Sequence, residues 1–146
     1  MSRAPRRAFC LTIALLPLVL LALSCGSGST DLSKMSKREI ADGFMQAIED
    51  GKPSTAERYV DVPRWNQVPG PSVESTMRSF VRQEWRRRSK GTVVPDGVVY
   101  RISSRVVVPG YAKTLCGPEK ILLDRTSSGW RVIGTRIVNG ANITNC

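Results

Sequence analysis

Residues 98–111 read VVYRISSRVVVPGY, and this stretch decides the class of fold. Apolar and polar residues alternate from Val98 to Ser103, and three consecutive valines follow before Pro109-Gly110. An alternation with a period of two and an enrichment in β-branched residues are typical of a strand with one buried face. The stretch therefore predicts a strand that enters a tight turn, with its partner beginning at Tyr111.

Three further strands are expected on the C-terminal side of this turn. They cover residues 111–116, 120–124 and 130–138, and short glycine-containing connections at 117–118 and 126–129 separate them. Short turns between β-branched segments favour an antiparallel meander. The C-terminal half therefore predicts a four-stranded antiparallel sheet.

On the N-terminal side, apolar residues recur with a helical period. Ser36 and Glu39 form a capping-box pattern at the start of the first helical segment, and Gly51 suits its C-terminal cap. Helices are expected over residues 31–50, 53–60 and 72–90, with an irregular proline-rich segment at 61–71. Helices followed by strands indicate an α+β fold, with the helices packed on one face of the sheet.

The first 24 residues are typical of a secretory signal peptide. Arg3, Arg6 and Arg7 precede an apolar run over residues 8–23, which is too short for a good membrane-spanning helix and contains Pro17. The segment around Arg6-Arg7 also resembles a twin-arginine export motif, whereas the leucine-rich run suits general secretion. Export by either route stays open.

The end of the apolar run, Ala22-Leu23-Ser24-Cys25-Gly26, resembles a bacterial lipobox. The usual pattern has Leu three residues before the cysteine, where this chain has Ala22. The resemblance implies that Cys25 is lipidated and anchors the chain to the bacterial cell membrane, facing the periplasm or the exterior. Ordinary cleavage near Ser24 is the alternative. The expected organisation is a signal peptide (1–24), a flexible tether (25–31) and one domain (32–146).

The 146-residue chain has 22 Lys and Arg against 12 Asp and Glu, a formal net charge of +10, and no histidine. The absence of histidine excludes Ser-His-Asp and Cys-His catalysis and His-ligated zinc. The sequence has no CxxC pair, phosphate-binding glycine loop or acidic calcium loop, so no cofactor or metal is expected. The positive charge suits anionic headgroups or a solvated surface. Nucleic acid is not an expected partner of an anchored envelope protein.

Of the four cysteines, Cys10 leaves with the signal peptide and Cys25 would carry the lipid. The remaining pair, Cys116 and Cys146, is expected to form a disulfide outside the cytosol. Such a bond would close a loop of about 30 residues and stabilise the fold by about 3–4 kcal/mol. Two free thiols are the alternative.

Two sets of side chains are candidates for function. Phe80, Trp85, Tyr100 and Trp130 would line a pocket or belong to the core. Glu84, on the helix expected over residues 72–90, is either a candidate acid or base or the partner of Arg88 in an ion pair at the helix edge. The basic set on the same helix would either be solvated or contact an anionic surface, and it comprises Arg82, Arg86, Arg87 and Arg88.

Residues 44–52 (FMQAIEDGK) and 56–60 (AERYV) resemble the opening of nuclear-transport-factor-2-like domains, and residues 128–133 (SGWRVI) resemble their ending. Small bacterial lipoproteins of unknown function carry this arrangement. The resemblance covers residues 32–138 and implies a cone, in which a curved sheet wraps round the long helix and leaves a pocket at its open end. Members of the family are enzymes or binding modules, and homodimers are common among them. No active-site residue maps onto this chain.

Three functions follow from these observations. We expect a non-catalytic, membrane-anchored envelope lipoprotein that binds a small apolar ligand or an envelope protein. One alternative is a structural or regulatory protein that acts through the basic helix surface. The other is an isomerase-like or hydrolase-like enzyme that uses a pocket carboxylate.

Overall fold

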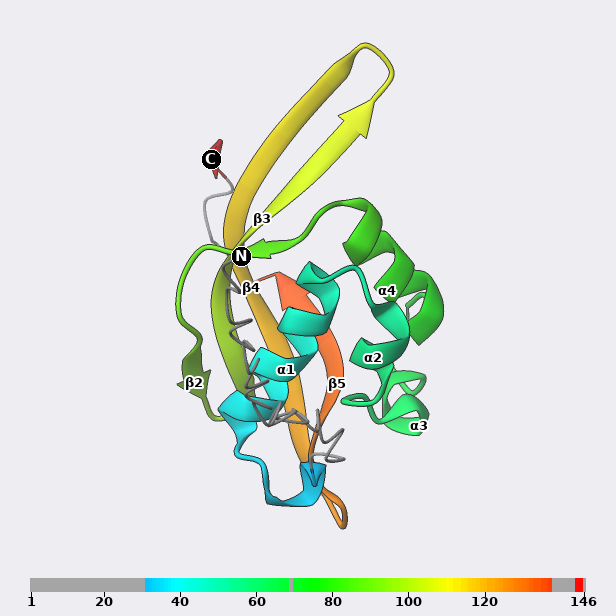
Figure 1. Cartoon of the computed structure of the whole chain (residues 1–146), viewed down its shortest axis with the longest axis vertical. Coiled ribbons are helices and arrows are strands. Elements are labelled where there is room, and N and C mark those ends of the chain that lie inside the picture. Colours follow the sequence, from blue (N-terminus) through cyan, green and yellow to red (C-terminus); the bar gives the residue numbers. More distant parts are fainter. Residues whose placement is uncertain (1–30, 69, 138–143, 146) are drawn as a thin grey trace, which may run out of the picture.

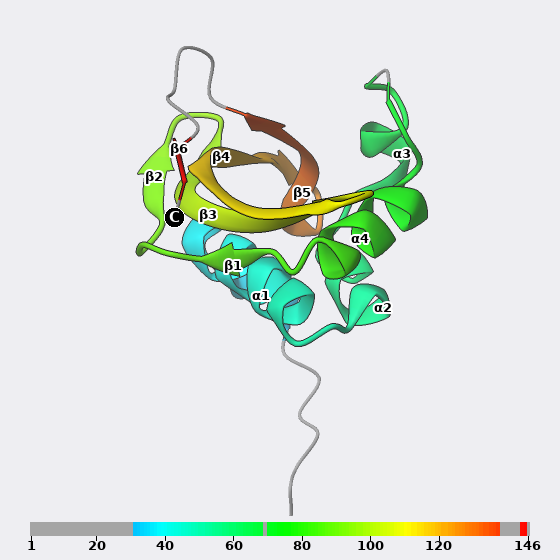
Figure 2. The same cartoon turned by 90° about the horizontal axis from the view of Figure 1, so that it is seen from above.

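In the computed structural model, which describes residues 31–68, 70–137 and 144–145, the helices precede the strands and pack against one face of the sheet (Figures 1 and 2). The helical elements are the 3-10 turn η1 (Leu32–Lys34), α1 (Lys37–Glu49), α2 (Pro53–Glu57), α3 (Val62–Trp65) and α4 (Val73–Arg82). The strands are β1 (Arg86–Arg87), β2 (Thr92–Val94), β3 (Gly97–Val108), β4 (Tyr111–Thr126), β5 (Gly129–Ile137) and β6 (Thr144–Asn145). The expected α+β class is confirmed.

Helix α1 begins and ends as its sequence predicts. The Ser36 hydroxyl accepts from the backbone N–H of Glu39, and the Glu39 carboxylate accepts from the backbone N–H of Ser36 at 2.7 Å. The chain leaves the helix through Gly51, whose φ of 69° lies in the left-handed region. One apolar face between these caps is buried against the sheet and α4, and its side chains are Ile40, Ala41, Phe44, Met45, Ala47 and Ile48. Each large side chain of this face stabilises the fold by about 1.5–3 kcal/mol.

The sheet is antiparallel and open, with the strand order β1-β3-β4-β5, and β2 and β6 pair with β3 and β4 respectively. The longest pairing runs from Gly97 opposite Leu122 to Val108 opposite Tyr111, so β3 and β4 form a hairpin whose tip projects beyond the helices (Figure 1). A register shift between Leu122 and Leu123, where β4 meets β5, accompanies the curvature of the sheet seen in Figure 2.

The helix expected over residues 72–90 ends at Arg82, so this prediction is wrong for its second half. Glu84 adopts a left-handed conformation with φ 51°, and the Trp85 backbone N–H donates to the carbonyl of Phe80 at 3.1 Å. The turn allows the Trp85 ring to stack on the Phe80 ring, with 3.8 Å between centroids. The next two residues, Arg86 and Arg87, then enter the sheet as β1.

The turn expected at Gly117-Pro118 is also wrong, because β4 continues through both residues. Pro118 lies opposite Arg101, whose backbone N–H donates to Ser89 Oγ and whose carbonyl accepts from Arg88. Both backbone groups of Arg101 therefore point away from β4, and the N–H that proline lacks is not needed by β3. Two expected strands thus merge into one, and the sheet has six strands with the short β1, β2 and β6.

The proline-rich segment at 61–71 contains the single helical turn α3, which the sequence did not predict. Asp61 caps this turn by accepting from the backbone N–H of Arg64 at 3.1 Å. Trp65, at its end, is buried and joins the core.

An ion-pair network fastens β1 to α1. The Arg87 guanidinium donates from Nε and Nη2 to Glu49 Oε2 at 3.0 and 2.7 Å, and from Nη1 to Asp42 Oδ1 at 3.2 Å. The Arg87 backbone N–H donates to Glu49 Oε1 at 2.5 Å, and the Tyr100 hydroxyl donates to Asp42 Oδ1 at 2.8 Å. These hydrogen bonds, those to Glu49 above all, raise the pKa of Arg87 despite its partial burial. The network joins residues far apart in sequence.

The network predicts that Glu49→Ala lowers the free energy of unfolding by about 2 kcal/mol, because the half-buried guanidinium and the backbone N–H of Arg87 both lose their carboxylate acceptor. Urea unfolding followed by tryptophan fluorescence measures the loss. The matched control is Glu74→Ala, which removes an exposed helical ion pair with Arg78 and is expected to cost about 0.5 kcal/mol or less. Equal losses in the two variants would contradict the assigned role of Arg87.

Candidate functional site

A cavity of about 370 Å³ lies between the C-terminal end of α4 and the inner face of β3, β4 and β5. Its walls are mainly apolar, with a few polar groups. The lining residues are Phe80, Gln83, Trp85, Ile102, Ser104, Leu115, Cys116, Gly117, Pro118, Glu119, Thr135 and Arg136. A volume of this size is typical of small-molecule sites.

The turn that ends α4 builds one wall of the cavity. The stacked rings of Phe80 and Trp85 face the sheet across the cavity, and the Trp85 indole N–H donates to Gln83 Oε1 at 3.2 Å. The carbonyl of Gln83 accepts from the backbone N–H of Arg105 on β3 at 2.6 Å. This backbone contact holds the end of α4 against the base of the β3–β4 hairpin.

The register of β3 and β4 builds the opposite wall. Ile102 lies opposite Gly117, and Ser104 lies opposite Leu115. Because Gly117 has no side chain, the wall is recessed at that position.

Glu119 is the buried ionisable group of this wall. It lies on β4 opposite Tyr100, and its exposed fraction is 8%. Burial raises the pKa of its carboxyl from 4.5 to about 7, and a hydrogen bond with the Thr135 side chain offsets part of this rise. Near neutral pH the carboxyl therefore either donates or accepts a hydrogen bond in the cavity.

Glu119 is not among the residues predicted from the sequence, because a turn is expected there at residues 117–118. With β4 continuous, Glu119 precedes Ile121 and Leu123 at alternating inward positions, and both of these are buried. The alternation of Glu119 with the apolar Ile121 and Leu123 is the sequence pattern that could have indicated a buried carboxyl.

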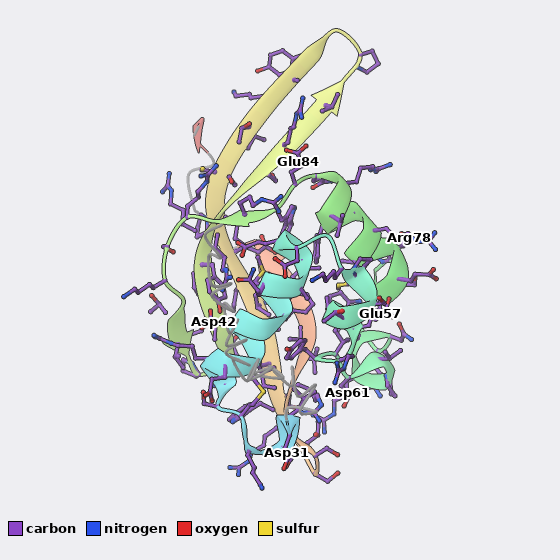
Figure 3. The ribbon with its side chains drawn as sticks, viewed as in Figure 1. Asp31, Asp42, Glu57, Asp61, Arg78 and Glu84 are labelled. Carbon is purple, nitrogen blue, oxygen red and sulfur yellow. The ribbon has the colours of Figure 1, made fainter. Side chains whose placement is uncertain are left out.

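The structure brings together two of the five residues expected to line a pocket, Phe80 and Trp85. Tyr100 is fully buried in the core, where it is fixed by Asp42, and Trp130 borders a separate depression, with the Lys37 ammonium 4.5 Å from its ring centroid. Glu84 is exposed and pairs with Arg105 at 3.2 Å, near the base of the hairpin (Figure 3). It is therefore not a pocket carboxylate.

The four arginines expected to share one basic helix face do not do so, because the helix ends at Arg82. Arg86 donates to the carbonyls of Glu49 and Trp85, Arg87 belongs to the ion-pair network, and Arg88 Nε donates to Ser103 Oγ at 2.8 Å. The expectation of a continuous arginine stripe is corrected accordingly.

Cys116 is buried on β4 and is disulfide-bonded. Strand β6 brings Thr144 opposite Cys116, two positions before the expected partner. Cys146 itself lies outside the described residues, as does Cys25, so the pairing and the lipidation stay predictions.

Within the described parts of the chain, no helix has the length and apolar character needed to cross a membrane, and no cluster of three acidic or cysteine ligands is placed to hold a metal ion. Comparisons of the chain with protein-family models, with curated proteins and with solved structures found no match.

The raised pKa of Glu119 predicts a pH dependence of stability. Because the folded state holds this proton more tightly than the unfolded chain, stability falls as the pH rises from about 4.5 to about 7 and then levels off. The full effect is about 3 kcal/mol. The variant Glu119→Gln has no carboxyl to ionise at this position and does not lose this stability. Its free energy of unfolding is therefore expected to increase relative to that of the native protein as the pH rises from about 4.5 to about 7.

Urea unfolding of both proteins from pH 4.5 to 8.5 measures that difference. The contributions of the other carboxyl groups to the pH dependence are the same in both proteins and cancel. The control Glu84→Gln removes an exposed carboxyl that pairs with Arg105 outside the cavity lining, and it measures the effect of losing one negative charge at the surface. A flat difference for Glu119→Gln would show that this carboxyl titrates normally.

Proposed function

We propose that the domain binds a small, mainly apolar molecule in the cavity between α4 and the sheet, without catalysing a reaction. The observation that carries this proposal is a cavity of about 370 Å³ with aromatic and aliphatic walls and one buried carboxyl. Ligand sites combine apolar walls with a few oriented polar groups in this way. Gln83, Ser104 and Thr135 provide further polar atoms in the lining.

Binding is favoured over catalysis by the composition of the lining. Acid–base enzymes commonly set two titratable groups against each other in one site. Among the described lining residues, Glu119 is the buried carboxyl, Cys116 is disulfide-bonded, and Arg136 is exposed. The second candidate is an enzyme that transfers a proton through Glu119, which its pKa near 7 favours.

We also infer a cone of the nuclear-transport-factor-2-like type. The supporting observations are the order of the elements, with α1, α2 and α4 before a curved antiparallel sheet, and a cavity beside the end of α4 rather than at the centre of the core. The resemblance of residues 44–60 and 128–133 supports the same inference.

The proposed setting is the bacterial cell envelope, with the domain anchored through fatty acids on Cys25. Support comes from the apolar leader, the lipobox-like segment and the Gly-Ser-rich residues 26–30 that precede the first described turn. The net positive charge of the chain suits a surface of anionic headgroups.

Lipidation predicts that Cys25→Ser moves the protein from the membrane to the soluble fraction, because the variant keeps the export signal and loses the anchor. Fractionation of cells with immunoblotting measures the shift, and labelled palmitate is expected in the native protein alone. The control is Cys10→Ser, which changes a cysteine of the leader. Membrane retention of unlabelled Cys25→Ser would contradict the anchor.

Occupation of the cavity predicts saturable binding of the neutral dye N-phenyl-1-naphthylamine, with a rise in its fluorescence. Ser104→Leu places a larger side chain on the wall and is expected to weaken binding at least tenfold. Thr114→Leu adds a similar side chain to an exposed position of β4 outside the lining and is expected to leave the affinity within twofold. If both variants bind the dye like the native protein while circular dichroism shows them folded, the cavity is not the binding site.

A further inference from the structure

We propose that the natural ligand is a cation, an apolar molecule whose protonated amine donates hydrogen bonds to the Glu119 carboxylate. This inference rests on the proposed function, which places an apolar ligand in the cavity, and it adds the charge of that ligand. The juxtaposition that carries it is a buried carboxyl without a cationic partner in a cavity large enough for a small molecule.

The basic side chains near Glu119 along the chain are committed elsewhere. Lys120, the next residue, donates to both oxygens of Asp96 at 3.1 and 3.0 Å. Lys120 lowers the pKa of Asp96, and Arg136, on the neighbouring strand β5, adds to that effect. Arg136 itself is exposed and also lines the cavity, and no charge interaction with it is among the causes of the shifted pKa of Glu119.

Arg105, outside the cavity lining, pairs with Glu84 at 3.2 Å. None of the ion pairs between described residues includes Glu119. The segments outside the described part that lie beyond residue 30, namely 69, 138–143 and 146, contain no lysine or arginine. The mature chain thus offers this carboxyl no cation from those segments.

A buried carboxyl without a counter-charge resists ionisation, which is why burial raises the pKa of Glu119. A ligand ammonium group reverses this balance, because it supplies opposite charge and charge-assisted hydrogen bonds where water is excluded. A ligand carboxylate would place two like charges together and is disfavoured. The cavity therefore selects a cation over an anion of the same shape.

The lining also meets the remaining needs of an ammonium group. A primary amine has three N–H donors when protonated. Besides the two oxygens of Glu119, the lining holds the hydroxyl of Ser104 and the amide oxygen of Gln83. The stacked rings of Phe80 and Trp85 add aromatic faces that attract a cation.

Binding of a cation predicts a characteristic pH dependence. The groups that face Glu119 are Tyr100 on β3, Thr135 on β5 and Gln83 after α4, and Arg136 is also in the lining. Burial raises the pKa of Tyr100 above its usual value, and the side chains of Thr135 and Gln83 do not ionise, so Glu119 is the group expected to change charge between pH 6 and 8. The affinity for an amine is therefore expected to rise about tenfold from pH 6 to pH 8, as Glu119 ionises.

The test uses three probes of one shape: 2-naphthylmethylamine, 2-naphthylmethanol and 2-naphthoate. Calorimetry measures their binding to the full exported chain with Cys25→Ser, which removes the proposed lipid and keeps the whole domain. At pH 8 the amine is expected to bind at least tenfold more tightly than the alcohol, and the carboxylate most weakly. Glu119→Gln is expected to abolish the advantage of the amine and leave the alcohol within threefold.

The matched control is Glu84→Gln, an exposed carboxyl near the cavity whose removal is expected to leave the preference for the amine unchanged. A second measurement uses the native side chain: in carbon NMR spectra the pKa of the Glu119 carboxyl is expected to fall below about 5 when the amine is bound.

Equal binding of amine and alcohol, tighter binding of the carboxylate, or an amine preference that survives Glu119→Gln would overturn the cation inference and leave the proposed binding function intact. If none of the three probes binds, and the neutral dye does not bind either, the proposed function fails together with it.

Discussion

The turn at Gln83–Trp85 is the constraint on which the rest of the domain depends. A left-handed Glu84 ends α4, and the stacking of Trp85 on Phe80 stabilises that ending. Because the helix stops there, Arg87 enters the sheet edge and reaches Glu49 on α1. The same turn places the stacked rings of Phe80 and Trp85 in the cavity wall. The end of α4 therefore determines both the contact between β1 and α1 and one wall of the candidate site.

The sequence predicted the elements that are determined locally. The Ser36–Glu39 capping box and the Pro109-Gly110 turn are found where their patterns placed them. The end of α4 was not predictable in this way, because residues 83–88 have good helical propensity and the strand at Arg86–Arg87 depends on contacts with residues about 40 positions earlier. The turn predicted at Gly117-Pro118 was wrong for a related reason. Only the hydrogen bond from the Arg101 backbone N–H to Ser89 shows that β3 and β4 lose no backbone hydrogen bond at Pro118.

The candidate site was predicted less well than the fold. Phe80 and Trp85 were among the four aromatic residues expected to line a pocket or belong to the core, but the contact between their rings arises from the end of the helix. Glu119 was missed because recognising an inward carboxyl requires the strand phase, and the phase depends on whether β4 is interrupted. The incorrect prediction of a turn at Gly117-Pro118 therefore prevented the recognition of Glu119 as a buried residue of the cavity.

Stability and binding are opposed at Glu119. In the empty domain an ionised carboxyl at this position costs free energy, and burial in an apolar wall is the cause. A ligand that stabilises the ionised form recovers this cost on binding, so its affinity contains a contribution that a neutral ligand does not receive. A glutamine of the same shape would give a more stable domain near neutral pH and a cavity with no preference for charge. The proposed binding of a cation would account for a buried carboxyl that the stability of the fold does not explain.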